Sequence, residues 1–216
     1  MPSTSRRRTP SADVGERLVA AAAGLLDRNG PDALTVRGVA ELASVSPTGV
    51  YNHLGGKDGI LSALFVRGFA ELRAAIDSIA ADDPHEALLE SGRRYRAEAL
   101  RHPGRYALMF DHAAGGWEPS MDDRLHAVAA FQALERRVAA GQAVGRFRQG
   151  RPTDVAQLVW SAVHGHVSLE LRNMLFADDA ERSFDDLLTM VVAGIAGQSP
   201  ADSGSSDTRS AAAPPS

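Results

Sequence analysis

Nine residues, from Ser46 to Leu54, carry the side chains best suited to one specific chemistry, which is contact with a DNA groove. The first of them is a favourable N-cap, and Pro47 stands at the first helical position, where its missing N–H is not needed. Val50 and Leu54 are four residues apart and can face a core together. The side chains left outward on this helix are those of Thr48, Tyr51 and Asn52. Short or planar hydrogen-bonding groups of this kind can contact phosphates and base edges.

A second short helix is predicted just upstream. Thr35 can cap it, and the helix then continues through Ala43. Its apolar positions have the i, i+3, i+4, i+7 spacing of one helix face: Val36, Val39, Ala40 and Ala43. The two helices flank Ser44 and Val45, which is the helix-turn-helix arrangement. In that arrangement the second helix enters the major groove, so the pattern predicts a DNA-binding head.

These two segments, Thr35–Ala40 and Ala43–Leu61, resemble the N-terminal domain of TetR-type transcriptional repressors. Tyr51, His53 and Lys57 recur at the family's spacing beside the hydrophobic frame. The resemblance implies an all-α fold, in which a three-helix DNA-binding domain precedes a helical ligand-binding and dimerisation domain. It also implies a double-stranded DNA operator and a small-molecule effector as partners.

Two positions depart from the family pattern. Family members usually have Phe where Leu54 stands and Gly where Ser44 stands in the turn. We therefore expect Ser44 to adopt the turn conformation that glycine would have taken, at a cost on the order of 1 kcal/mol if φ is positive. Neither departure removes a proposed DNA contact.

The residues expected to contact DNA are Thr35, Arg37, Ser46, Pro47, Thr48, Tyr51, Asn52, His53 and Lys57. In an arbitrary helix Tyr51 would be interpreted as an aromatic side chain at the edge of a core and His53 as a solvated one, but the motif context reverses both interpretations. Lys57 is the one lysine of the chain and lies at a predicted helix start, where it could hold a phosphate. A basic arm at Arg6–Arg8 either reaches DNA or is solvated.

Composition is compatible with this interpretation. The net charge of the 216 residues is −4, but residues 1–60 carry seven Lys and Arg against six Asp and Glu, so this part is slightly basic and the remainder acidic. With no cysteine there is no disulfide framework, thiol nucleophile or thiolate metal site. The chain shows no apolar run long enough for a membrane span and no secretory signal, so we expect it to be cytoplasmic and not to interact with a membrane.

The rest of the chain has helical spacing throughout, with no strand-like alternation and no repeat, and about nine helices are predicted in total. A long helix is expected over 57–81. Another is expected to run from Pro152 to about Phe176, and Ser183 is expected to cap the last one. The expected organisation is a disordered basic arm at 1–10, a helix-turn-helix domain at 11–56, a linking helix at 57–82, a ligand-binding and dimerisation domain at 83–197 and a disordered tail at 198–216.

The last two helices are apolar on more than one face, and one face needs a partner because so large a patch is rarely exposed on a soluble monomer. A homodimer through these helices provides that partner and also suits a palindromic operator. TetR proteins pair through their last two helices, so the resemblance implies the same dimer. The residues expected at the interface are Val163, Val167, Leu171, Met174, Leu187, Val191 and Ile195.

A second, weaker resemblance concerns the body of the chain. Trp160, His164, Gly165, Leu169 and Glu170 resemble the tryptophan and histidine-glycine signature of one subgroup of regulatory C-terminal domains. Aromatic side chains are spread over the helices that would enclose a ligand, although each could instead be ordinary core. The residues expected to bind a ligand are Tyr106, Met109, Phe110, Trp117, Phe131, Trp160 and His164.

No enzymatic or cofactor motif competes with this interpretation. Gly55-Gly56-Lys57 is not a phosphate loop, because Tyr51 and Asp58 stand where that motif needs Gly and Ser or Thr. His164 and His166 are two apart and point to different faces of a helix, so no metal site is expected. No cofactor is expected either. The sequence thus predicts a ligand-responsive repressor and not an enzyme. The alternatives are a small-molecule-binding or enzymatic helical protein that retains the head, and an activator with the same head.

Overall fold

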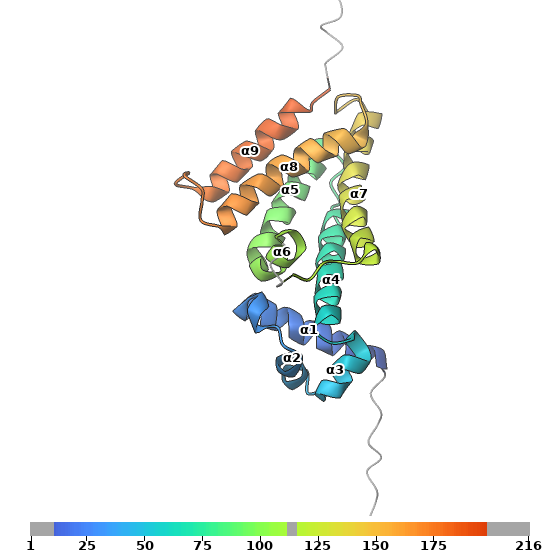
Figure 1. Cartoon of the computed structure of the whole chain (residues 1–216). Coiled ribbons are helices and arrows are strands. Elements are labelled where there is room, and N and C mark those ends of the chain that lie inside the picture. The colour runs from blue at the N-terminus through green and yellow to red at the C-terminus, as the bar shows by residue number, and fades with distance from the viewer. Residues whose placement is uncertain (1–10, 112–115, 198–216) are drawn as a thin grey trace, which may run out of the picture.

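A computed structural model describes residues 11–111 and 116–197, and within them the chain forms nine α-helices, one 3₁₀ turn and no strand (Figure 1). The all-α prediction is therefore confirmed. The predicted arm at 1–10 and tail at 198–216 lie outside the described residues. The elements in order are α1 (Ser11–Asn29), η1 (Pro31–Ala33), α2 (Val36–Leu42), α3 (Pro47–Leu54), α4 (Lys57–Asp77), α5 (Pro84–Arg101), α6 (Pro103–Phe110), α7 (Met121–Ala143), α8 (Pro152–Leu171) and α9 (Ala180–Gly194).

Side-chain caps define the starts of the helix-turn-helix pair, as the sequence predicts. Thr35 Oγ1 accepts a hydrogen bond from the backbone N–H of Gly38 at 3.0 Å, and Ser46 Oγ accepts one from Gly49 at 3.1 Å. Between the two helices Ser44 has a φ of 54°, so it occupies the left-handed conformation expected for a residue that replaces glycine.

The predicted end of α8 is wrong by about one turn, because the helix stops at Leu171 and not near Phe176. Asn173 has a φ of 54°, its N–H donates to Glu170 O at 3.0 Å, and the N–H of Met174 donates to Leu169 O at 2.9 Å. These two bonds form a Schellman motif, which closes the helix through a left-handed residue. Asn173 is the sequence feature that indicates this helix end, which the spacing of the apolar residues did not reveal.

The predicted start of the last helix is wrong as well. Helix α9 begins at Ala180, and Asp179 caps it by accepting a hydrogen bond from the N–H of Arg182 at 3.0 Å. Ser183 is inside the helix, where its hydroxyl lies 3.3 Å from His166 Nε2 of α8. Similarly, the predicted linking helix is a few residues too long, because α4 ends at Asp77.

Helix α4 joins the two parts of the molecule. In Figure 1 it runs from the α1–α3 head toward the body that α5–α9 form. Its first turns bury Ile60, Leu61 and Leu64 in the core of the head, and Phe65 and Phe69 follow in a cluster with α7. Gly59 allows the head to pack on this helix, since a Cβ there would lie 1.3 Å from the carbonyl oxygen of Leu54.

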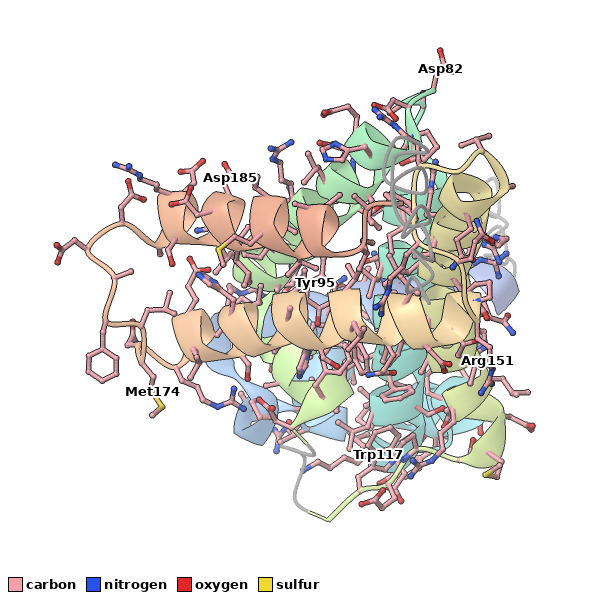
Figure 2. The ribbon with its side chains drawn as sticks, turned by 90° about the horizontal axis from the view of Figure 1, so that it is seen from above. Asp82, Tyr95, Trp117, Arg151, Met174 and Asp185 are labelled. Carbon is pink, nitrogen blue, oxygen red and sulfur yellow. The ribbon has the colours of Figure 1, made fainter. Side chains whose placement is uncertain are left out.

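Viewed from above, α8 and α9 lie side by side, and Tyr95 of α5 is seen between them (Figure 2). The buried core of the body lies beneath these two helices and includes Phe147, Val159, Phe184 and Leu188. None of the described helices combines the length and the apolarity needed to cross a bilayer.

Candidate nucleic-acid interface and ligand pocket

Helix α3 presents the predicted polar side chains to solvent. Val50 is fully buried and Leu54 is half-buried, so the helix packs on the head through the two residues that the spacing indicated. Tyr51 is 60% exposed, and its ring lies against Gly56, where a Cβ would come within 2.9 Å of a ring carbon. The other exposed residues of the predicted set on this helix and its cap are Ser46, Pro47, Thr48, Asn52 and His53.

The remaining predicted DNA contacts lie before and after α3 in the sequence. Thr35, Arg37 and Lys57 are all exposed. The oxygens of Thr35 and Ser46 accept capping hydrogen bonds, so each hydroxyl still has its proton to donate to a phosphate. Lys57 is the first residue of α4, which adds the positive end of a long helix to its own charge. In Figure 1 α2 and α3 lie at the end of the molecule away from α8 and α9.

The body contains a cavity of about 500 Å³ between α4, α5, α6, α7 and α8. This volume is in the range of small-molecule sites. Its lining includes four of the residues that the sequence predicts to bind a ligand, namely Met109, Phe110, Phe131 and Trp160.

Other lining residues were not predicted, chiefly Phe65 and Phe69 of α4 and Tyr95 of α5. The two phenylalanines are four apart on one apolar stripe, which the sequence attributed only to the linking helix. Nothing local in the sequence indicates that this stripe ends in a cavity. The cavity opens to solvent beside Arg124, Val128 and Gln157, the exposed residues of its lining.

Three predicted ligand residues, Tyr106, Trp117 and His164, are not part of this lining. His164 Nδ1 lies 2.8 Å from the Tyr95 hydroxyl and 2.9 Å from that of Tyr106. The His164 ring supports the pocket wall from behind, with its centroid 4.8 Å from that of Phe110 and 5.3 Å from that of Trp160.

Tyr106 instead lines a separate cavity of about 30 Å³, and Trp117 packs edge-on against Phe65, with centroids 5.8 Å apart. For Tyr106 and His164 the physical reason is that the polar atoms of these rings are hydrogen-bonded to each other within the protein and do not point into the cavity.

Burial keeps this cluster uncharged. Desolvation raises the pKa of Tyr95 far above its usual value, and proximity to Tyr106 adds to the effect. The pKa of Tyr106 is also raised by burial, and burial lowers the pKa of His164. The tyrosines and the histidine are therefore neutral at pH 7, and the deep wall of the cavity carries no charge.

A polar cluster connects the body to the DNA-binding head. Asp27, near the end of α1, has Oδ2 2.8 Å from His102 Nδ1 and 3.4 Å from a guanidinium nitrogen of Arg105. Arg105 is almost completely buried and also pairs with Glu71 of α4. Helix α6 approaches α1 closely at Gly104, since a Cβ on this residue would lie 2.7 Å from the carbonyl oxygen of Leu26. The first turn of α6 thus contacts the head, while its last turn lines the cavity.

Three of the predicted interface residues, Val163, Val167 and Ile195, are buried in the core of the body. This corrects the sequence expectation, because they face the body and cannot meet a second copy. The periodicity revealed two apolar faces on each helix but did not indicate which one packs inward. The other predicted residues are more open: Leu171, Leu187 and Val191 are half-buried, and Met174 is exposed after the end of α8.

The outward face of α8 and α9 is built from other apolar and small residues. Leu158 and Leu169 are exposed on α8, and Met190 is 72% exposed on α9. Gly165 and Gly194 face open space, since a Cβ on either would meet no atom within 4 Å. Within the described residues, no three His, Asp or Glu side chains gather in a way that could hold a metal ion.

Comparison with known proteins agrees with this geometry. Residues 18–64 match a family model described as bacterial regulatory proteins, tetR family, and residues 88–191 match one described as Tetracyclin repressor-like, C-terminal domain. A relative from Mycobacterium tuberculosis, the uncharacterized HTH-type transcriptional regulator Rv0681, is 28% identical over 182 residues, which cover 83% of this chain and 80% of the relative.

Solved structures share the fold. A protein with unknown function from Rhodococcus sp. RHA1 aligns with a TM-score of 0.76 and 23% identity over 90% of this chain and all of that protein. The TetR family transcriptional regulator PfmR from Thermus thermophilus aligns with a TM-score of 0.61 and 21% identity, covering 82% of this chain and 97% of the regulator.

Proposed function

The chain belongs to the TetR family of DNA-binding transcriptional regulators, and from this premise we propose that it is a repressor that binds a palindromic operator as a homodimer and is released by a small-molecule effector. One observation supports the proposal above all others. Two of the five helices that line the cavity, α4 and α6, also contact the DNA-binding head.

The proposed DNA contacts divide by chemistry. Thr35, Ser46 and Lys57, with Arg37, offer donors and charges for phosphates, which provide affinity but no sequence information. Thr48 and Asn52 can reach base edges from the first two turns of α3, with Pro47, Tyr51 and His53 around them.

The proposed dimer surface is the outward face of α8 and α9. Leu158, Leu169 and Met190 supply its exposed apolar area. A glycine in the middle of a helix destabilises it by roughly 1 kcal/mol relative to alanine, so Gly165 is best explained by the close approach of another helix. Phe176, in the connection between the two helices, is completely exposed as well. A two-fold pairing of this face covers apolar area that a monomer would leave in water.

In the proposed response, an effector in the cavity presses on Met109 and Phe110 at the end of α6. A Cβ on Gly68 of α4 would lie 2.5 Å from Met109 Sδ, so α6 packs directly on α4 and cannot move without affecting it. A displacement of α6 also acts on Asp27 of the head through Arg105. A coupling of about 1 to 3 kcal/mol between the two sites changes operator affinity about 5- to 150-fold.

The test is binding of the full chain to labelled duplexes from the region upstream of its own gene, at several salt concentrations. We expect a steep loss of affinity with salt and two chains per operator. Binding no tighter than to an unrelated duplex of equal length contradicts the assignment. Transcription of the downstream gene should rise in a deletion strain, and a fall would make the protein an activator.

A further inference from the structure

Three of the polar side chains that line the body cavity, those of Ser91, Tyr95 and Gln157, have partners within the protein. Ser91 Oγ donates to the carbonyl oxygen of Ala87 at 2.7 Å, and the Tyr95 hydroxyl lies 2.8 Å from His164 Nδ1. At the mouth the amide nitrogen of Gln157 donates to the Ser161 hydroxyl at 3.0 Å. The rest of the lining is almost entirely aliphatic and aromatic.

Among the described residues of this lining, Arg124 is the one that carries a charge, and it has partners as well. Its Nε donates to the carbonyl oxygen of Pro119 at 3.2 Å, and a terminal nitrogen donates to Glu118 Oε2 at 3.0 Å. An anion bound to Arg124 would compete with the Glu118 carboxylate at a half-exposed site, where an ion pair contributes little.

Unsatisfied polar atoms lie elsewhere. Among the described side chains, the buried nitrogen and oxygen atoms without a hydrogen-bond partner belong to Asp27, Arg105 and His166, and none of these residues lines the cavity. The hydroxyls of Ser91 and Tyr95 and the guanidinium of Arg124 thus offer a ligand only groups that already have partners within the protein. A charged group taken into this space would lose its hydration without compensation.

We propose that the effector is a neutral, mainly apolar molecule, an alkyl or aryl body with at most one uncharged polar group that stays at the mouth near Arg124 and Gln157. The inference rests on the proposed role of the cavity as the effector site. The affinity for such an effector comes from the apolar area that it buries, and the selectivity comes from the size and shape of the cavity.

The test uses matched probes that differ only in the head group: 1-decanol, decanoate and decylammonium at pH 7.5. The Trp117→Phe variant of the full chain leaves Trp160 as the single tryptophan, and its fluorescence reports on the pocket wall. We expect 1-decanol to bind at least tenfold more tightly than either ion. From 1-hexanol to 1-decanol, affinity should rise about fourfold per methylene, which corresponds to ~0.8 kcal/mol per buried CH₂.

A pair of variants on α7 controls for the binding site. Ala127→Phe fills the cavity, since Ala127 is in the lining, and should abolish 1-decanol binding. Ala140→Phe puts the same ring on an exposed position of the same helix outside the lining and should bind 1-decanol normally. Thermal stabilisation of the wild-type chain by the same probes provides a second readout that needs no tryptophan.

Decanoate or decylammonium that binds as tightly as 1-decanol overturns the proposal. Equal 1-decanol binding by the two alanine variants overturns it too, and so does the absence of any alkanol binding. These measurements need no DNA, so their failure is distinguishable from that of the proposed function. If 1-decanol binds selectively but leaves DNA affinity unchanged, the ligand class stands and the effector role of the cavity is wrong.

Discussion

His102 Nδ1 lies 2.8 Å from Asp27 Oδ2, which ties the junction of α5 and α6 to the end of α1 across 75 residues of sequence. The same carboxylate oxygen lies 3.4 Å from Arg105, a guanidinium that is nearly buried. The body therefore contacts the head through a hydrogen-bonded cluster as well as through the continuous helix α4. This contact connects the DNA-binding head to the body, and the expected effects of several substitutions depend on it.

Asp27→Asn should destabilise the chain by about 1–3 kcal/mol, because the nearly buried Arg105 loses one of its two anionic partners. Denaturant unfolding measures the difference. Arg73→Ala, which removes an exposed pair with Asp77, should change stability by less than about 1 kcal/mol. Equal effects of the two substitutions would mean that the cluster contributes no more than a surface ion pair.

Lys57→Ala should weaken binding to the upstream duplex at every sequence tested and reduce the slope of log affinity against log salt by about 1, as expected for one lost phosphate contact. Tyr51→Ala should weaken binding as well while the chain remains dimeric. Fluorescence anisotropy and light scattering make the two measurements. Gln132→Ala, exposed on α7 of the body, is the control and should bind as the wild type does. Unchanged affinity in both head variants would contradict the DNA assignment.

Ser44→Gly should stabilise the head by up to about 1 kcal/mol, because Ser44 has a φ of 54° and a side chain disfavours that conformation. Ser46→Ala, two residues on, should do the opposite and cost about 1 kcal/mol through the lost N-cap of α3. Thermal unfolding of the two variants under identical conditions checks the signs. A lower melting temperature for Ser44→Gly would show that the serine side chain is needed in the turn.

Gly165→Leu should split the dimer without unfolding the subunit. A Cβ on Gly165 meets no atom within 4 Å of its own chain, so the monomer has room for the larger side chain, but a second copy does not. Gly15→Leu is the matched control, because a Cβ on Gly15 of α1 also meets nothing within 4 Å. Sedimentation should find a monomer only for Gly165→Leu, and a dimer there would place the interface on another surface.

Stability should fall as the pH drops below the usual histidine pKa of about 6.5. Burial lowers the pKa of His164 and of His166 in the folded chain, so the unfolded chain takes up more protons below that pH. The contribution is fully present above the unfolded pKa and is lost as the pH falls toward the folded one. His164→Gln should flatten the decline, as followed by denaturant midpoints from pH 7.5 to pH 5. If the stability of the His164→Gln variant declines as steeply as that of the wild type, other titrating groups cause the effect.

Local signals in the sequence were enough to predict the helices of the DNA-binding head. The caps at Thr35 and Ser46, the proline after the second cap and the four-residue spacing of Val50 and Leu54 act within one or two helical turns. Such short-range rules predict both the helices and the face that remains outward. For the same reason, the presence of Ser44 in place of glycine was enough to predict the left-handed backbone conformation of this residue.

The cavity and the inward faces of α8 and α9 were decided only by the tertiary structure. Phe65 and Tyr95 line the same space from helices that are separate in the sequence, while His164 stands behind the wall that it was expected to form. Periodicity predicts that a helix has an apolar face, but it cannot predict which neighbour covers that face or where packing leaves a space. Those outcomes depend on contacts between segments far apart in the chain, as in the bond between His102 and Asp27.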